Sequence, residues 1–256
     1  AISPELAAFV DRVLREMDAE GLFPETVTTT SPFIATVLRT HFPSVKIRWS
    51  VNLRVHGTIG FESVEELFDS FYVSREHQRD RRYLAELADW AKQHGKVMGL
   101  QANSGCIRQC PFQTFHDNLH GHGDGRRPED VATAKDYGFS FFRCKTHYER
   151  GNYEDFLRAP WLRPEDMPNY EPFVEIVKLA TRRHPHPVKV LEAYATCRYS
   201  GNLADLMDPA HAFPKSFENE RFDAVSDLWG AVRECPNVNN CRHCGTCTKL
   251  MKEVYE

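Results

Sequence analysis

Strand-like and helix-like segments alternate along the first 102 residues, and this alternation restricts the fold more than any other feature. The expected helices cover residues 3–20, 31–42, 64–68 and 80–94, and the expected strands cover residues 26–29, 45–51, 71–74 and 96–102. A strand followed by a helix about every 20 to 25 residues indicates βα units around a parallel sheet. The pattern therefore predicts an α/β fold and leaves open whether the sheet closes into a barrel.

Two later segments, residues 140–142 and 174–179, have the character of weaker strands. Because the chain opens directly on a helix, a barrel built from these units would be incomplete at its N-terminus. Neither a GxGxxG nor a GxxxxGK pattern occurs in the sequence, so the common phosphate-binding loops are absent.

Composition narrows the class of protein. The 256 residues carry 32 basic and 36 acidic side chains, for a net charge of -4, and 41% of them are hydrophobic. This balance is typical of a soluble globular chain and indicates no general nucleic-acid-binding surface. No apolar run reaches the length of a membrane span, and charged residues throughout the first turns of the chain argue against a signal peptide. We therefore expect a cytoplasmic protein.

The cysteines are unevenly distributed. None of the 8 precedes Cys106, and half of them lie in residues 235–247. A secreted disulfide scaffold is usually short and spreads its cysteines along the chain. We therefore expect reduced thiols that bind a metal, with buried spectator thiols as the alternative for the isolated Cys144 and Cys197.

The tail carries the strongest signal for a metal site. Its pattern is Cys235-Pro236-x4-Cys241-x2-Cys244-x2-Cys247. Two consecutive two-residue gaps are typical of three corners of a 4Fe–4S cluster, although here the Cys-Pro pair precedes the triplet. Tetrahedral zinc on four thiolates is the competing interpretation, and a redox dithiol or no site is the remaining one. We expect residues 1–212 to form the α/β domain and residues 213–256 to form a Cys-rich, metal-binding segment.

A second group of candidate ligands follows the strand at residues 96–102. It contains Cys106, Cys110, His116, His120 and His122. Active sites of barrels are built from loops in this position, and His116 and His120 would share one face of a helix. A CxxxC pair alone is weak evidence, and ordinary surface or hydrogen-bonding roles are the alternative for each histidine.

Two further features bear on this second group. Cys144 and Cys197 are the thiols that would complete a set of four with Cys106 and Cys110. An arginine at the end of a strand, such as Arg182, is suited to bind a carboxylate or phosphate, with a solvated charge or structural salt bridge as the alternative.

Several stretches of the chain resemble the peptidase U-32 family. The resemblance covers about residues 5–250 and is sharpest in NSGCIRQCPFQTFHDNLHGH at residues 103–122. The other matching stretches are SPFIATVLRTHFPSVKIRWSVN at residues 31–52, LRPEDMPNYE at 162–171, VKLATR at 177–182 and AYATCRYSGNL at 193–203.

The resemblance implies a TIM-barrel-like core and a 4Fe–4S cluster on four cysteines. In this chain the ligands would be Cys106, Cys110, Cys144 and Cys197. Arg182 would hold an anionic substrate or donor. The family's founding activity is that of a collagenase-like protease. Better-understood relatives support oxygen-independent hydroxylation of ubiquinone precursors or of tRNA and rRNA bases, in some cases with prephenate as the oxygen donor.

Three functions follow from these observations. The first is an iron–sulfur redox or hydroxylase-like enzyme, with one or two clusters and a small-molecule or RNA substrate, and with a paralogous protein as a partner. The second is a metal- or cysteine-dependent peptidase in which His116 acts as a base beside Cys110. A thiolate bound to a metal cannot attack a peptide, so we rank this second. The third is a non-enzymatic, zinc- or cluster-bearing partner subunit.

Overall fold

The computed structural model describes residues 2–121, 136–140, 142–235 and 241–255, without the side chains of 118–121 and 242. The described chain forms two compact units. The first comprises Ala1–Gln101 and Tyr170–Lys178, and the second comprises Ala102–Asn169 and Leu179–Glu256.

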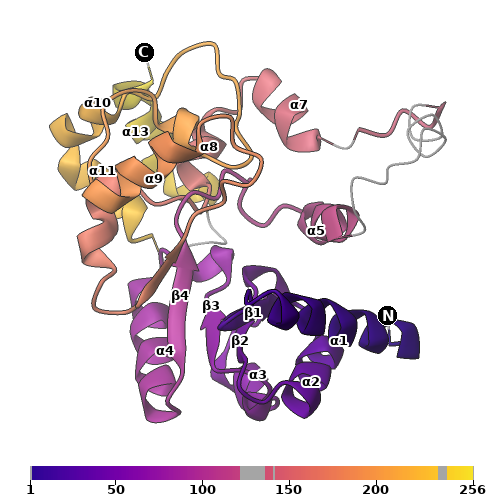
Figure 1. Cartoon of the computed structure of the whole chain (residues 1–256). Coiled ribbons are helices and arrows are strands. Elements are labelled where there is room, and N and C mark those ends of the chain that lie inside the picture. Colours follow the sequence, from indigo (N-terminus) through magenta and orange to yellow (C-terminus); the bar gives the residue numbers. More distant parts are fainter. Residues whose placement is uncertain (1, 122–135, 141, 236–240, 256) are drawn as a thin grey trace. The chain divides into compact units, whose positions relative to one another are not determined.

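The first unit is built on a five-stranded parallel sheet (Figure 1). Its strands are β1 (Thr26–Thr29), β2 (Lys46–Trp49), β3 (Ser70–Tyr72), β4 (Val97–Gln101) and β5 (Ile176–Lys178). They pair in the order in which they occur along the chain, without the reversal that marks an open doubly wound sheet. The predicted α/β class is confirmed, and the curled sheet corresponds to half of a barrel. A closed TIM barrel stays a prediction.

The three longer helices of this unit, α1, α2 and α4, begin where the sequence provides caps. They are α1 (Pro4–Ala19), α2 (Pro32–His41), α3 (Thr58–Glu62) and α4 (Arg81–Gln93), with the 3-10 turns η1 (Val51–Leu53), η2 (Glu65–Leu67) and η3 (Arg75–His77). The Ser3 and Ser31 hydroxyls and the Asp80 carboxylate accept hydrogen bonds from backbone amides three residues on, at 3.1, 3.3 and 3.1 Å. Such caps satisfy amides that a helix leaves unpaired.

Aromatic side chains fill the core beside the sheet. The Trp49 and Phe68 rings lie 4.5 Å apart, the Phe61 and Phe71 rings lie 4.3 Å apart, and Trp90 of α4 packs against Phe61 at 5.6 Å. All five side chains are buried. Large aromatic rings contribute more buried area than any other side chains, so this cluster stabilises the first unit.

Gly99 allows β4 and β5 to pair closely. A β-carbon at this position would lie 2.9 Å from the carbonyl oxygen of Ile176 and 2.9 Å from the Tyr72 ring. Both distances are shorter than van der Waals contact, so a side chain here would push β5 away from β4.

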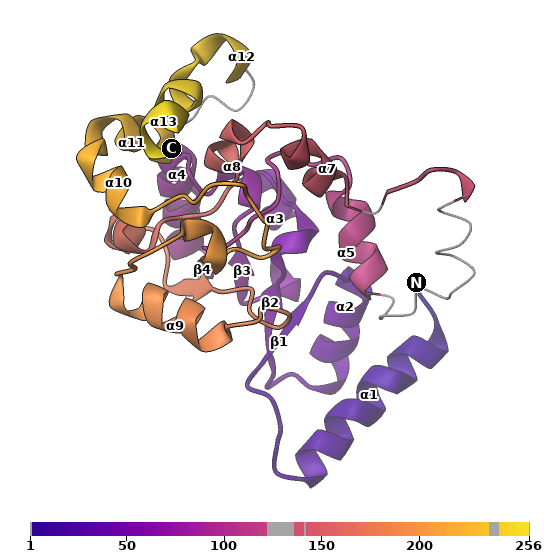
Figure 2. The same cartoon turned by 90° about the horizontal axis from the view of Figure 1, so that it is seen from above.

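The second unit consists mainly of short helices. They are α5 (Gln113–Gly121), α7 (Arg143–Glu149), α8 (Glu154–Arg158), η4 (Pro164–Asn169), α9 (Pro187–Thr196), η5 (Leu203–Leu206), α10 (Asn219–Ala224), α11 (Ser226–Arg233), α12 (Cys241–Cys244) and α13 (Thr246–Val254). In this unit α13 packs against α8, α10 and α11, as the grouping of these helices in Figure 2 also shows. None of the described helices is both long and apolar enough to cross a membrane.

The structure corrects two of the expected elements. The helix expected at residues 64–68 is a 3-10 turn at Glu65–Leu67, preceded by α3. The strand expected at 140–142 is not found at Ser140 or Phe142, and residue 141 lies outside the described residues. Here the Ser140 hydroxyl accepts a hydrogen bond from the Phe142 amide at 3.3 Å, which forms a turn before α7. The domain boundary expected after residue 212 stays a prediction.

Candidate functional site

Asn103 anchors the loop that follows β4. Its side chain is fully buried. Its amide nitrogen donates to the carbonyl oxygens of Ala180 and Leu206 at 2.9 and 3.0 Å, and its oxygen accepts from the Ala180 amide at 2.7 Å. One side chain thus joins three segments of the second unit and fixes the backbone three residues before Cys106.

Gly105 brings this loop against residues 207–211. Its amide donates to the Asp208 carbonyl oxygen at 3.0 Å, and a β-carbon here would collide with the Pro209 carbonyl oxygen. The Nε2 atom of His211 donates to the Gly105 carbonyl oxygen at 3.0 Å. The position of the neighbouring Cys106 is therefore set by backbone contacts on both sides of Gly105.

Three of the predicted core thiols influence the titration of one buried phenol. Tyr148 is 2% exposed, and its pKa is raised by burial, then by Asp155, and then by Cys144, Cys106 and Cys110. The pKa of Cys144 is also raised, first by burial and also by the charge of Cys110. The charges of Cys106, Cys110 and Cys144 thus all bear on the Tyr148 hydroxyl, and their role as cluster ligands stays a prediction.

Tyr148 and His211 are functional candidates that the sequence interpretation missed. The His211 ring lies 4.7 Å from the Tyr148 ring, and Phe213 lies 5.0 Å from it. Burial lowers the pKa of His211, an effect that its hydrogen bond to Gly105 opposes only in part, so this imidazole is neutral near pH 7. For Tyr148 the sequence did contain a signal, because it follows Cys144 by one helical turn and the two would share a helix face. For His211, no neighbouring residue in the sequence indicates a functional role.

Cys197 occupies a different setting from the other predicted core ligands. It ends α9 in the left-handed backbone region, at φ 52°, and its thiol lies 3.7 Å from the Tyr194 carbonyl oxygen. Its role as the fourth ligand stays a prediction.

The predicted histidine helix forms, and aromatic rings surround its first histidine. His116 lies on α5, with ring centroids of Phe112, Phe115 and Phe142 at 6.0, 5.8 and 6.2 Å. His120 also lies on α5, but its side chain is outside the described residues, as is the whole of His122. The catalytic role predicted for His116 stays a prediction.

Arg182 is exposed in the turn between β5 and α9. Its side chain is therefore accessible to an anion, but its predicted catalytic role is untested.

Buried polar side chains at the end of β3 form a candidate that the sequence interpretation passed over. Arg75 and Arg79 are 7% and 2% exposed, and Arg75 donates to the Asn52 side-chain oxygen at 2.7 Å. Active sites of parallel α/β folds lie at the carboxyl ends of the strands. The sequence did contain a signal for this candidate. The expected strand ends at residue 74, and Arg75 follows it directly.

The four tail cysteines line one small cavity in the second unit. The cavity has a volume of about 30 Å³ and is lined by Cys235, Cys241, Cys244 and Cys247 together with Arg158, Ala231, Val232 and Thr246. The pKa of Cys244 is lowered by hydrogen bonds with the Thr246 hydroxyl and amide, and further by the charges of Arg158 and Lys249. The thiolate form that binds metals is therefore favoured at Cys244.

Neither group of cysteines has the compact arrangement of a single-ion site. In the parts of the chain that the structure describes, no three His, Cys, Asp or Glu side chains are grouped so that they could hold one metal ion. All eight cysteines are present as thiols rather than disulfides. The donor chemistry of both groups, thiols alone, fits soft metals and iron–sulfur clusters.

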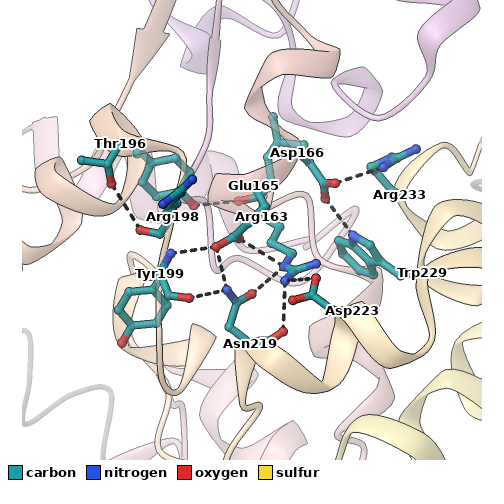
Figure 3. A network of polar contacts seen from close by, with 12 residues as sticks. Arg163, Glu165, Asp166, Thr196, Arg198, Tyr199, Asn219, Asp223, Trp229 and Arg233 are labelled. Carbon is teal, nitrogen blue, oxygen red and sulfur yellow. Dashed lines mark hydrogen bonds and ion pairs between the residues drawn. The ribbon is translucent and has the colours of Figure 1, made fainter.

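Arg163, in the LRPEDMPNYE stretch, has a structural role (Figure 3). Arg163 is 4% exposed and donates to Asn219 at 2.5 and 3.1 Å and to Asp223 at 2.7 Å. Glu165 completes the network through an ion pair with Arg163 at 3.2 Å and hydrogen bonds from Tyr199 and Asn219 at 2.7 and 2.8 Å. The network ties η4 to α10, so Arg163 is a buried structural charge.

Asp166 extends this attachment to α11. Its two carboxylate oxygens accept from the Trp229 indole at 2.7 Å and from Arg233 at 3.0 Å (Figure 3). Because α11 leads directly to Cys235, this contact also fixes the first cysteine of the tail relative to η4.

Comparison with known proteins gives one distant relative. No family model and no solved structure matches the chain. A stretch of 158 residues is 26% identical to "Uncharacterized protease MJ1657" of Methanocaldococcus jannaschii, which covers 60% of this chain and 44% of that protein. The match thus spans less than half the length of the relative. Together with the motifs of residues 103–203, it supports a relationship of this chain to the peptidase U-32 family.

Proposed function

We propose that this chain is an iron–sulfur enzyme in which Cys106, Cys110, Cys144 and Cys197 bind a 4Fe–4S cluster. The observation that supports this most is that the charges of three of these thiols, Cys106, Cys110 and Cys144, all raise the pKa of the buried Tyr148 hydroxyl. Cysteine thiolates are the usual ligands of such clusters, and a partly buried, water-poor setting stabilises them. When bound, the cluster would supply one-electron redox chemistry.

The residues around the thiols would shape the site. His211 is neutral and holds the Gly105 carbonyl, so it positions the cysteine loop without adding charge. The raised pKa of Tyr148 keeps its hydroxyl protonated, which makes it a hydrogen-bond donor toward a thiolate or cluster sulfide. We keep Arg182 as the proposed anion-binding residue and His116 as a proposed catalytic residue.

For the reaction, we propose a redox or oxygen-independent hydroxylation of a small molecule or an RNA base. A prephenate-like anion as the oxygen donor would suit an arginine, which binds carboxylates through two hydrogen bonds. The net charge of -4 favours a small molecule over a large RNA surface, since RNA binding depends on clustered positive charge. The family resemblance supplies this reaction class, and a paralogous protein partner belongs to the same proposal.

The test is the iron and sulfide content of anaerobically purified protein, with Mössbauer spectroscopy. The Cys106→Ser/Cys110→Ser double variant should lose about four iron atoms and four sulfides per chain. A Cys144→Ser variant should lose the same amount, and Cys197→Ser tests the fourth ligand. Iron content that is unchanged in the Cys106→Ser/Cys110→Ser variant contradicts the proposal.

A peptidase is the second candidate, because the relative from Methanocaldococcus jannaschii is named a protease. It predicts cleavage of denatured collagen by protein from which iron has been removed. Activity that survives iron removal but is lost in Cys110→Ser and His116→Gln variants would favour this candidate over the first.

A further inference from the structure

The tail brings four thiols to one cavity from three different helices. Cys235 follows α11, Cys241 and Cys244 are the ends of α12, and Cys247 lies in the first turn of α13. All four line the cavity described above. Side chains that converge from separate helices onto one space form a more specific arrangement than their spacing in the sequence alone indicates.

The backbone of the tail suits this convergence. Gly245 separates α12 from α13 and has φ 70°, the left-handed region that glycine adopts without strain. Cys244 and Cys247 lie on either side of this turn, and both line the same cavity.

The helices α11 and α13, next to the cysteines, are held in place by packing and hydrogen bonds. Leu250 and Val254 of α13 are fully buried, and the Tyr255 hydroxyl accepts a hydrogen bond from the Lys215 amide at 3.2 Å. The Trp229 contact with Asp166 holds α11. Apolar packing and these hydrogen bonds therefore position α11 and α13, the helices on either side of Cys241 and Cys244.

Arg158 supplies a positive charge to the cavity. It ends α8, its side chain is 18% exposed, and its Nη1 atom donates to Asp155 at 2.5 Å. Its Nε atom is buried and has no hydrogen-bond partner among the described residues. An unsatisfied buried N–H is costly, and the neighbouring space is lined by sulfur atoms, which accept hydrogen bonds from arginine in many cluster sites.

We propose that Cys235, Cys241, Cys244 and Cys247 bind a 4Fe–4S cluster of their own, with Arg158 as its compensating cation and hydrogen-bond donor. This site is separate from the Cys106 group and stands whether or not that group binds iron. The CxxCxxC spacing favours a cluster over a single zinc ion, because a cluster is the larger object that three such thiols commonly share. Four thiolates on either metal centre leave net negative charge, which the partly buried Arg158 offsets.

The experiment measures iron, sulfide and zinc in the full chain after anaerobic purification. The Cys241→Ser/Cys244→Ser variant is compared with the Cys106→Ser/Cys110→Ser variant and the unaltered protein. With both clusters present, we expect about eight iron atoms in the unaltered chain and about four in each variant. Circular dichroism checks that each variant keeps its helices.

Each other result has a distinct meaning. Full iron retention in the Cys241→Ser/Cys244→Ser variant overturns the tail cluster and leaves the Cys106 proposal intact. Full retention in the Cys106→Ser/Cys110→Ser variant, with loss from the tail variant, supports the tail cluster and contradicts the other. Stoichiometric zinc that disappears with the tail cysteines overturns the iron–sulfur assignment of the tail, and absence of iron from the unaltered chain overturns both.

The role of Arg158 is tested in the Cys106→Ser/Cys110→Ser background, where only the tail cluster would contribute to the measured midpoint potential and to the rate of iron loss. Arg158→Gln should lower the cluster's midpoint potential, because a positive charge beside the cluster favours the reduced form. It should also speed the loss of iron to a chelator by roughly ten-fold, the usual effect of removing a ligand's outer partner. Arg221→Gln, at an exposed position of α10, is the matched control. Equal potentials and equal rates in the two variants would contradict a role for Arg158.

Discussion

The replacement of Asn103 by alanine tests how the loop before Cys106 is held. Asn103 makes three side-chain hydrogen bonds in a fully buried position, with the Ala180 amide, the Ala180 carbonyl and the Leu206 carbonyl. Each contributes about 1 kcal/mol, so Asn103→Ala should lower the free energy of unfolding by about 3 kcal/mol. Asn169→Ala, which removes a single bond to the Asp166 carbonyl, should cost about 1 kcal/mol.

Two measurements check this expectation. Urea unfolding gives the free energies, and hydrogen exchange with mass spectrometry follows the Ala180 amide, whose acceptor is the Asn103 oxygen. Exchange at Ala180 should accelerate in Asn103→Ala and stay unchanged in Asn169→Ala. An Asn103→Ala variant that is no less stable than Asn169→Ala, with normal protection at Ala180, would refute the claim that this side chain fixes the loop.

Three other substitutions test separate parts of the argument. Gly105→Ala should destabilise the fold and reduce the iron content, because the new β-carbon would meet the Pro209 carbonyl oxygen. The control Gly230→Ala lies in open space within α11 and should stabilise the protein by up to about 1 kcal/mol, as measured by thermal unfolding. Arg163→Met should lower the free energy of unfolding in urea by about 2 to 4 kcal/mol, because it removes the hydrogen bonds from Arg163 to the buried Asn219 and to Asp223, against less than about 0.5 kcal/mol for Arg221→Met. Equal losses would contradict a structural role for Arg163. Because the pKa of His211 is lowered in the folded protein, the unfolded chain takes up a proton at this histidine at higher pH than the folded chain does. The free energy of unfolding should therefore fall as the pH drops below 6.5. His211→Gln should reduce that fall in unfolding curves measured at pH 5 to 8.

The sheet unit follows from local sequence patterns. The helix expected at 80–94 is found at Arg81–Gln93, and the strand expected at 45–51 is found at Lys46–Trp49. Both depend on neighbouring residues: an Asp80 cap in the first case and a short apolar run in the second. The strand expected at 140–142 failed because a Ser140 turn outweighed the apolar run of phenylalanines.

The candidate site was only partly predictable. The cysteines were found from their spacing, and the charges of three of the four core thiols bear on one side chain, Tyr148, while their role as ligands stays a prediction. The residues that surround them come from distant positions: Arg158 precedes the tail by more than seventy residues, and His211 lies about a hundred residues after Gly105. Such neighbours are set by tertiary packing, which leaves no periodic signal in the sequence.

The late position of β5 has a consequence for how this chain is made. β4 ends at Gln101 and its partner β5 begins at Ile176, so a ribosome delivers β1 to β4 long before the strand that completes the sheet. Until then, the open edge of β4 offers unpaired amides and carbonyls beside a bare glycine, Gly99, where another extended segment could pair. The newly made chain therefore passes through a stage with an unpaired strand edge that can associate with other chains, and a chaperone that covers this edge would raise the yield of folded protein.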